Sequence, residues 1–381
     1  MDEKTHQKLE NQKTLFSNRL KRKIKELKKW ARKNKISCYR IYDRDIPEIP
    51  VSLDLYEFLP DHIQNKIEAA KYTSFVAERI SQNDPTVQGE LVLNTYAVIY
   101  LYERPYEKDE KEEEFWFDQI AKTAAEVLNI PFSHIVKKER KRQRGTNQYE
   151  KDEEKENIYS IKGLTQECGE LFNIDLTSYL DTGLFFDHRP LRSIVRETAS
   201  KKSVLNLFCY TGSFSVYAAE GGAKKVESVD LSNTYLTIAK NNMDLNGFSD
   251  KNAYIYTRQD VIEFLKEKAV KAKAGELKED EYYDMIILDP PTFSNSKNTY
   301  NVLDINKDWP KLCKDCLNIL APGGILYFST NSTKLSFDKS LLPQATVKNK
   351  VIMITDMTES SIPKDFEGTK CHKLWEFKIA K

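Results

Sequence analysis

Four short polar motifs, each directly after an apolar run, stand in order in the second half of the chain. The first is NLFCYTGS at 206–213, where Gly212 provides a turn that lets the backbone approach a ligand closely. Its spacing is not G-x-G-x-x-G, which argues against a dinucleotide pyrophosphate as the ligand. Taken alone, the motif is explained equally well by an ordinary tight turn between a strand and a helix.

The second and third motifs each supply a carboxylate. Asp230 ends a strand-like run 18 residues after Gly212, where it can accept hydrogen bonds from both ribose hydroxyls of an adenosine group. Asp260, in RQDV, can accept from the exocyclic amine of adenine. It can also cap the amphipathic helix that VIEFL predicts, and the two roles are compatible.

The fourth motif is DPPTF at 289–293, after the apolar run MIIL. Its two prolines fix the backbone and remove two N–H donors, so Asp289 is held in a rigid frame, and Phe293 can stack on a base. A purely structural Pro-Pro turn is the alternative. Because the four motifs follow successive predicted strands, together they predict a methyltransferase dependent on S-adenosylmethionine (SAM), with Asp289, Pro290 and Phe293 as its catalytic residues.

Strand-type and helix-length segments alternate after Pro190, which is the pattern of parallel strands joined by crossover helices. It predicts an α/β domain at 181–381 with a doubly wound, Rossmann-like sheet of seven strands. The last two strand-type runs, at 347–358 and 371–379, are expected to be antiparallel to each other. Ligands bind at the carboxyl ends of such parallel strands, so we expect the four motifs along one edge of the sheet.

The first half, 1–180, is predicted to be a smaller α+β RNA-binding domain that begins with a basic helix. An apolar stripe from Phe16 to Ala31 recurs every three or four residues, opposite a face rich in lysine and arginine. Other predicted elements are a hairpin at 38–43 and 51–58, helices near 61–80 and 115–129, and strands at 93–103, 133–139 and 157–163, with the run 171–180 leading out.

Composition narrows the class of protein. The 381 residues suffice for two domains, and 40% hydrophobic with 31% charged residues is typical of a soluble protein with a core. Six scattered cysteines and the absence of a secretory signal or long apolar run predict a reduced, cytoplasmic protein without membrane spans. No metal is expected, since Cys313 and Cys316 lack partner ligands and fit the core face of a helix.

These motifs resemble a known family. NLFCYTGSFS, SVDLS, DPPTFSNSK and APGGILYFSTN are similar to class I RNA methyltransferases of the RlmK/RlmI group, and most of all to the RlmK family of 23S rRNA guanine-N7 methyltransferases. Matching stretches at 16–57, 140–151 and 182–190 extend the resemblance over nearly the whole chain. It implies SAM as cofactor, 23S rRNA in a precursor or assembly intermediate as partner, and 7-methylguanosine at the family's guanine site as product. A homodimer is compatible with the sequence, which does not define the oligomeric state.

The segment TGLFFDHRP at 182–190 borders the cofactor pocket by this resemblance; a surface loop with a helix cap before Pro190 is the alternative. We expect His188 to be structural. The predicted cofactor-binding residues are Phe185, Asp187, Arg189, Asn206, Phe208, Tyr210, Thr211, Gly212, Ser213, Asp230, Leu231, Ser232, Asp260, Val261 and Asp289.

The chemistry of the acceptor distinguishes the alternatives. Guanine N7 carries an in-plane lone pair and no proton, so its methylation needs no base, whereas an N2 amine must lose a proton and cytosine C5 needs a thiolate. No cysteine stands in 289–292 or 328–331, and Cys209 is expected to pack, so C5 is disfavoured while N2 stays open. A non-catalytic RNA-binding factor in ribosome assembly is the third hypothesis.

RNA binding is expected at two basic segments that could contact phosphates while the target base is extruded. A solvated lysine-rich surface is the alternative reading of both. The predicted residues are Arg19, Arg22, Lys23 and Lys29 on the basic helix, and Arg140, Lys141, Arg142 and Arg144 in the loop that follows 133–139.

Overall fold

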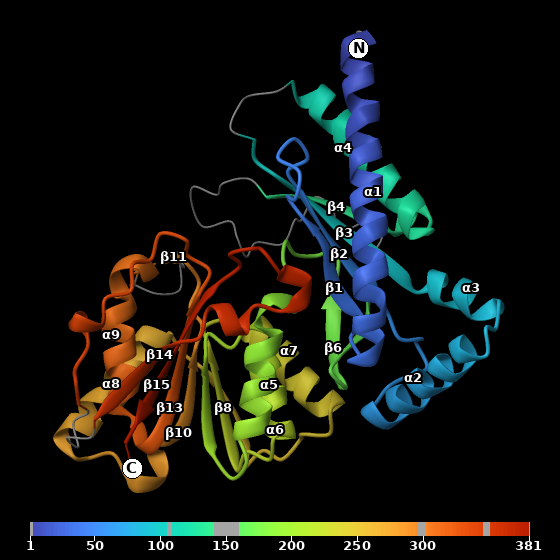
Figure 1. Ribbon diagram of the computed structural model, residues 1–381. Helices are drawn as coiled ribbons and strands as arrows, with labels where there is room; N and C mark the ends of the chain where they lie inside the picture. Colours follow the sequence, from blue (N-terminus) through green and yellow to red (C-terminus); the bar gives the residue numbers. More distant parts are fainter. Residues whose placement is uncertain (1–2, 105–108, 141–159, 296–301, 346–350, 381) are drawn as a thin grey trace. The chain divides into compact units, whose positions relative to one another are not determined.

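The computed structural model describes residues 3–104, 109–140, 160–295, 302–345 and 351–380. These residues form two compact units, shown in Figure 1. The first comprises Met1–Thr182 with Lys364–Phe366, and the second comprises Gly183–Pro363 with Glu367–Lys381. Each unit is considered by itself below. Within the described residues, no helix combines the length and the hydropathy needed to cross a membrane.

A four-stranded sheet organises the first unit, in the order β1-β2-β3-β4. The strands are β1 (Cys38–Asp43), β2 (Val51–Glu57), β3 (Thr95–Tyr102) and β4 (Ile135–Arg140). The first three are antiparallel neighbours, and β4 runs parallel to β3. The predicted hairpin and the strand type of the other two runs are therefore confirmed.

Helices α1 (Glu3–Lys33) and α4 (Glu110–Leu128) pack against this sheet and share one core with it. The apolar stripe of α1 is buried as predicted, but the helix begins about four turns before Phe16. Leu9 and Gln12 extend the buried stripe, and the Gln12 amide oxygen accepts a hydrogen bond of 2.9 Å from the Trp116 indole nitrogen. This satisfied polar contact stabilises a part of α1 that apolar periodicity alone does not reveal.

Two helices and a hairpin complete the first unit. Helix α2 (Lys66–Ser81) begins later than predicted, because the Asn65 side chain caps it by accepting from two backbone N–H groups. Helix α3 (Thr86–Leu93) was not predicted. Strands β5 (Lys162–Glu167) and β6 (Glu170–Asp175) form a separate two-stranded hairpin. The start of the strand predicted at 157–163 lies outside the described residues.

The second unit contains the predicted seven-stranded sheet, in the order β14-β15-β13-β10-β7-β8-β9. Its strands are β7 (Ser203–Leu207), β8 (Lys225–Asp230), β9 (Tyr254–Arg258), β10 (Tyr283–Leu288), β13 (Leu320–Thr330), β14 (Ile352–Asp356) and β15 (Lys373–Ile379). Within this sheet, the neighbours in the run β13-β10-β7-β8-β9 are parallel. Strand β15 is antiparallel to both β13 and β14. The doubly wound fold and the antiparallel final pair are thus confirmed.

Helices cover both faces of this sheet, as Figure 1 shows. They are α5 (Arg189–Thr198), α6 (Ser213–Glu220), α7 (Asn233–Leu245), α8 (Val261–Ala274) and α9 (Ile305–Asn318). Alternate residues of β10 enter opposite cores: Ile286 and Leu288 join the core with α8 and α9, and Met285 and Ile287 join the core with α5 and α6. Burial on both faces explains the apolar run at 285–288 in β10.

Candidate methyltransferase site

The strand order reverses direction between β7 and β10, and this point is where the site is expected. From β7 the chain proceeds through β8 to β9 on one side, whereas β10 lies on the other side of β7. The last residues of the two strands, Leu207 and Leu288, are paired in register. The first and fourth motifs therefore leave the sheet side by side, at the kind of position where doubly wound proteins bind their ligands.

The turn after β7 is shaped by the carboxylate that ends β8. Phe208, Tyr210 and Gly212 have φ angles of 53°, 50° and 76°. Asp230 accepts hydrogen bonds from the backbone N–H groups of Tyr210 (3.0 Å) and Ser232 (2.9 Å). Burial raises the pKa of Asp230, against these backbone donors, which lower it. Each carboxylate oxygen keeps a further lone pair, so the predicted contact with ribose hydroxyls remains compatible with the geometry.

Gly212 is required by packing within the protein. A Cβ atom at this position would stand 2.7 Å from the Cβ of Ala239 on α7, and the positive φ already disfavours other residues. The adjacent Thr211 donates a hydrogen bond of 2.6 Å from its hydroxyl to the Gly183 carbonyl. The segment at 182–190 and the turn are thus joined directly. The close approach to a ligand predicted for Gly212 remains a prediction.

An aromatic group stands beside the turn. The ring of Tyr210 lies 5.3 Å from that of Phe185 and 4.7 Å, edge to face, from that of Tyr235 on α7. Phe185 is 42% exposed, so this group offers apolar surface next to Asp230. Tyr235 was missed in the sequence because no strand-end motif includes it.

Other predicted cofactor residues have local structural partners. The amide nitrogen of Asn206 donates to Ser215 (2.9 Å) inside the unit. Asp260 caps α8, as anticipated, by accepting from the two backbone N–H groups that follow it. Ser232 caps α7, Leu231 accepts from Arg258 through its carbonyl oxygen, and Val261 is buried. Their contacts with cofactor remain predictions.

Asp289 is held from two sides. Its carboxylate accepts a hydrogen bond from the Ser329 hydroxyl at the end of β13 and lies 3.3 Å from Nε2 of His188. Burial favours a higher pKa for Asp289, but the charge and hydrogen bond of His188 and the hydrogen bond of Ser329 outweigh it, so the pKa is lowered. Phe293 follows on β11 (Phe293–Asn295), which pairs with β12 (Val302–Asp304), and is 47% exposed.

His188 lies at the centre of a buried charged group. Its Nε2 is 4.0 Å from the Asp187 carboxylate, and that carboxylate lies 3.2 Å from Nδ1 of His372. Burial disfavours the charged form of His188, but Asp289 and Asp187 outweigh burial and raise its pKa to about 9. The pKa of Asp187 is lowered below its ordinary range by the two histidines, despite burial. His188 is therefore a cation at neutral pH.

Three of these side chains could hold a metal ion on distance alone, since donor atoms of Asp187, His188 and His372 lie within 4.8 Å of one another. Their orientation does not fit one. The two imidazole rings are stacked with centroids 4.8 Å apart and planes 19° from parallel. Because imidazole binds a metal in its ring plane at about 2 Å, stacked rings cannot both direct a lone pair at one ion. The group fits a shared proton and charge network better.

The cysteine in the turn after β7 and the two cysteines of α9 lack the features of nucleophiles. Cys209 in the turn is buried, and burial raises the pKa of its thiol well above the ordinary value. Cys313 and Cys316 lie on α9 with no exposed surface, as predicted for a core-facing pair, and burial raises the pKa of both. A thiolate is the reactive form, so none of the three is prepared for attack.

The predicted RNA-binding residues fall into three classes. Arg22 and Lys29 are exposed on α1. Others have acidic partners: Arg19 contacts Asp45, Lys23 lies 3.9 Å from Glu26, and Arg140 contacts Asp181 at 3.0 Å and covers the Tyr100 ring. Lys141, Arg142 and Arg144 lie outside the described residues.

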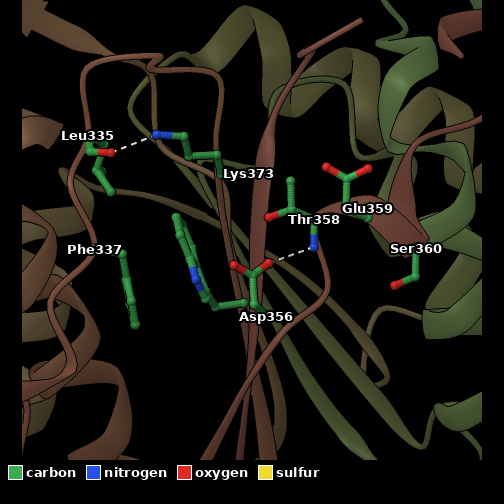
Figure 2. Close-up of a pocket in the computed structure, with 8 residues that line it drawn as sticks. Leu335, Phe337, Asp356, Thr358, Glu359, Ser360 and Lys373 are labelled. Atoms are coloured by element: carbon green, nitrogen blue, oxygen red, sulfur yellow. Dashed lines mark hydrogen bonds between the residues drawn. The ribbon is translucent and has the colours of Figure 1, made fainter. Parts of the chain in front are cut away.

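A pocket of about 520 Å³ lies near the same edge of the sheet, where β14 ends and β15 begins. Figure 2 shows Asp356 accepting from the Thr358 backbone N–H (2.9 Å) and the Lys373 ammonium donating to a carbonyl. None of the predicted site residues lines it. Two of its lining residues, Ser360 and Lys373, are chain neighbours of Ser361 and His372, which belong to the charged group.

Comparison with known proteins assigns the family. Residues 92–365 match the S-adenosylmethionine-dependent methyltransferase family. Ribosomal RNA large subunit methyltransferase K of Neisseria meningitidis is 39% identical over 365 residues, which are 96% of this chain and 87% of that protein. Methyltransferase K/L of Pseudomonas fluorescens is 36% identical over 95% of this chain, but the chain spans only 40% of its length.

The fold comparison agrees. The crystal structure of SMU.776, solved with bound SAH, has a TM-score of 0.66 at 21% identity and aligns with 96% of this chain and 82% of that one. SAM is the cofactor of the family that residues 92–365 match, and the turn, the Asp230 carboxylate and the aromatic group at the strand ends suit an adenosine-bearing molecule. The chain therefore belongs to the S-adenosylmethionine-dependent methyltransferases, in the family that includes ribosomal RNA large subunit methyltransferase K.

Proposed function

We propose that this protein transfers the methyl group of SAM to N7 of a guanine in 23S rRNA. The observation that carries the choice of atom is the state of Asp289. Ion-paired to His188, with a lowered pKa, it is a poor base but a good hydrogen-bond acceptor. The similarity to methyltransferase K supports the choice of RNA.

Methylation at N7 requires the protein to bind and orient the two reactants, but not to remove a proton. SAM, when bound, supplies an activated methyl group, and the protein supplies orientation. We infer that Asp230 and the aromatic group of Phe185, Tyr210 and Tyr235 bind its nucleoside. In this proposal Asp289 accepts hydrogen bonds from the N–H groups of guanine, which leaves the in-plane lone pair of N7 free to attack. No proton has to be removed, so no base has to be regenerated.

The alternatives need groups that the described site supports less well. Methylation of the N2 amine requires a proton acceptor, and a carboxylate paired with an imidazolium is a weak one. Methylation of cytosine C5 requires a thiolate, and Cys209 is a buried, neutral thiol. A purely RNA-binding role leaves the ordered set of strand-end motifs without a purpose.

The experiment is a product analysis. The protein is incubated with labelled SAM and with 23S rRNA purified from a strain that lacks this gene, either as naked RNA or in assembled large subunits. Nucleoside analysis should give 7-methylguanosine, and the naked form should be the better substrate. Label only on N2 or C5 contradicts the choice of atom, and no transfer to either substrate favours the RNA-binding factor. An Asp289→Asn variant serves as the low-activity control.

A further inference from the structure

A line of buried and half-buried side chains joins the carboxy-terminal segment to Asp289. It runs from Ser361 to His372 (2.8 Å), Asp187 (3.2 Å), His188 (4.0 Å) and Asp289 (3.3 Å). These residues come from four places in the second unit: the turn at Glu359–Ser361, the start of β15, the turn at Phe186–His188, and the end of β10. Segments remote in sequence thus converge on one carboxylate.

Part of this line has the order of a hydrolytic triad, Ser361–His372–Asp187, but it is not built to attack a substrate. Ser361 has no exposed surface, and its hydroxyl also lies 2.9 Å from the Thr358 carbonyl. A nucleophile needs access to its substrate. The accessible end of the line is Asp289, so the residue that can meet a substrate is this carboxylate, and the other side chains hold it in place.

We propose that His188 is a positioning residue: supported by Asp187, His372 and Ser361, it fixes the Asp289 carboxylate in the orientation that receives the target base. This inference rests on the proposed function and names the residue on which it depends. Asp289 itself is the residue that touches the base. His188 acts through it, without contact with the reacting atoms.

The geometry around Asp289 supports this role. Pro290 fixes the backbone directly after Asp289. Ser329, at the end of β13, donates a hydrogen bond to the carboxylate, and His188, in the turn at Phe186–His188, contacts the same carboxylate. Without His188 the carboxylate could rotate toward solvent and populate several rotamers. Small errors in the position of a bound reactant cost large factors in rate.

Several charged and aromatic groups surround the His188 ring, but only one of its two ring nitrogens has a polar partner among the described residues. The groups that face it are Asp187, Asp289, the stacked ring of His372, the Arg192 cation and the Phe214 ring. Its Nδ1 is buried and has no hydrogen-bond partner among the described residues. The ring therefore makes its contacts with the carboxylates through Nε2 alone, and the shorter of the two, 3.3 Å, is with Asp289.

The test compares two amides of different reach. In His188→Gln the amide nitrogen can occupy the place of Nε2 and donate to Asp289, whereas in His188→Asn it is too short. We expect His188→Asn to lower the turnover rate by on the order of 100-fold, with SAM affinity within about twofold of wild type by calorimetry. His188→Gln should recover at least a tenth of the wild-type rate. Equal losses in the two variants, or a loss confined to RNA affinity, would overturn the proposal.

A second pair tests the far end of the line. Ser361→Ala removes the hydroxyl that supports His372, and Ser360→Ala removes the hydroxyl of its neighbour in the same turn, which lines the pocket of Figure 2. Turnover should fall several-fold in the first and stay unchanged in the second; equal rates would remove Ser361 from the line. Turnover is measured as total label in RNA, whichever atom is methylated. A product methylated at another atom therefore contradicts the proposed function alone. Equal losses of turnover in His188→Gln and His188→Asn contradict this inference alone.

Discussion

At the scale of the residue, two of the carboxylates with a proposed chemical role, Asp230 and Asp260, also accept hydrogen bonds from the backbone. Asp230 accepts a hydrogen bond from Tyr210 in the turn, in addition to its proposed contact with a nucleoside, and Asp260 caps α8. Asp289 is the exception, because its partners are side chains rather than backbone. This difference predicts different responses to substitution.

For Asp230 we expect a loss of cofactor binding. Asp230→Asn keeps one acceptor and the shape of the side chain, but it loses charge-assisted hydrogen bonds worth about 1.5–3 kcal/mol each. SAM affinity measured by calorimetry should fall by about tenfold or more. Asp260→Asn keeps a good helix cap and serves as the comparison, with a smaller expected loss. Unchanged affinity in Asp230→Asn would remove this residue from the ribose role.

The pKa of His188 gives a pH dependence with a defined sign. Its folded pKa of about 9 lies above the ordinary value of 6.5, so the folded state binds the proton more tightly than the unfolded state. The resulting stabilisation is complete below about pH 6.5 and is lost as the pH rises through 9. The melting temperature of wild type should therefore fall between pH 7 and 9.5 by several degrees more than that of His188→Gln. Parallel curves for the two proteins would show that His188 is not charged in the folded state.

At the scale of the element, the sequence predicted much of the second unit because parallel strands buried on both faces appear as apolar runs, and β10 is the clearest case. The turn at 206–213 was placed for the same reason. The start of α1 and helix α3 were missed, because Gln12 is buried as a polar partner of Trp116, and because α3 buries only Val87. A periodicity of apolar residues carries neither signal.

The charged group was missed for a different reason. His188 and His372 are 184 positions apart in the sequence, and their stacking is a product of the tertiary fold alone. Neither residue belongs to a run with a period, and a lone histidine gives no indication of its partners. The interpretation of His188 as structural therefore omitted the contact with Asp289 that gives it a proposed role.

The packing of α7 against the turn after β7 yields a prediction for Gly212. Gly212→Ala combines a positive φ with a Cβ placed 2.7 Å from Ala239, so it should destabilise the second unit by about 2–4 kcal/mol. Gly275→Ala is a matched control, because Gly275 has a similar φ of 72° and a Cβ atom added there would meet no other atom within 4 Å. Chemical denaturation should show a clearly smaller loss, about 1 kcal/mol, in the control. Equal losses would assign the whole effect to the φ angle.

At the scale of the whole molecule, the net charge of +1 provides no general attraction to nucleic acid, so RNA affinity has to come from local surfaces. The exposed basic residues of α1, which include Arg22 and Lys29, are the predicted surface of this kind. Replacing both with Glu should weaken binding to 23S rRNA and reduce the dependence of the affinity on salt concentration. SAM affinity should be unchanged, because α1 belongs to the first unit and the strand-end motifs belong to the second.

The control is the double variant Lys271→Glu with Lys273→Glu, at the exposed end of α8. It makes the same change in net charge and should leave RNA affinity nearly unaltered. If both double variants lose RNA affinity equally, overall charge rather than α1 governs binding, and if the α1 variant also loses SAM affinity, the substitutions have disturbed folding.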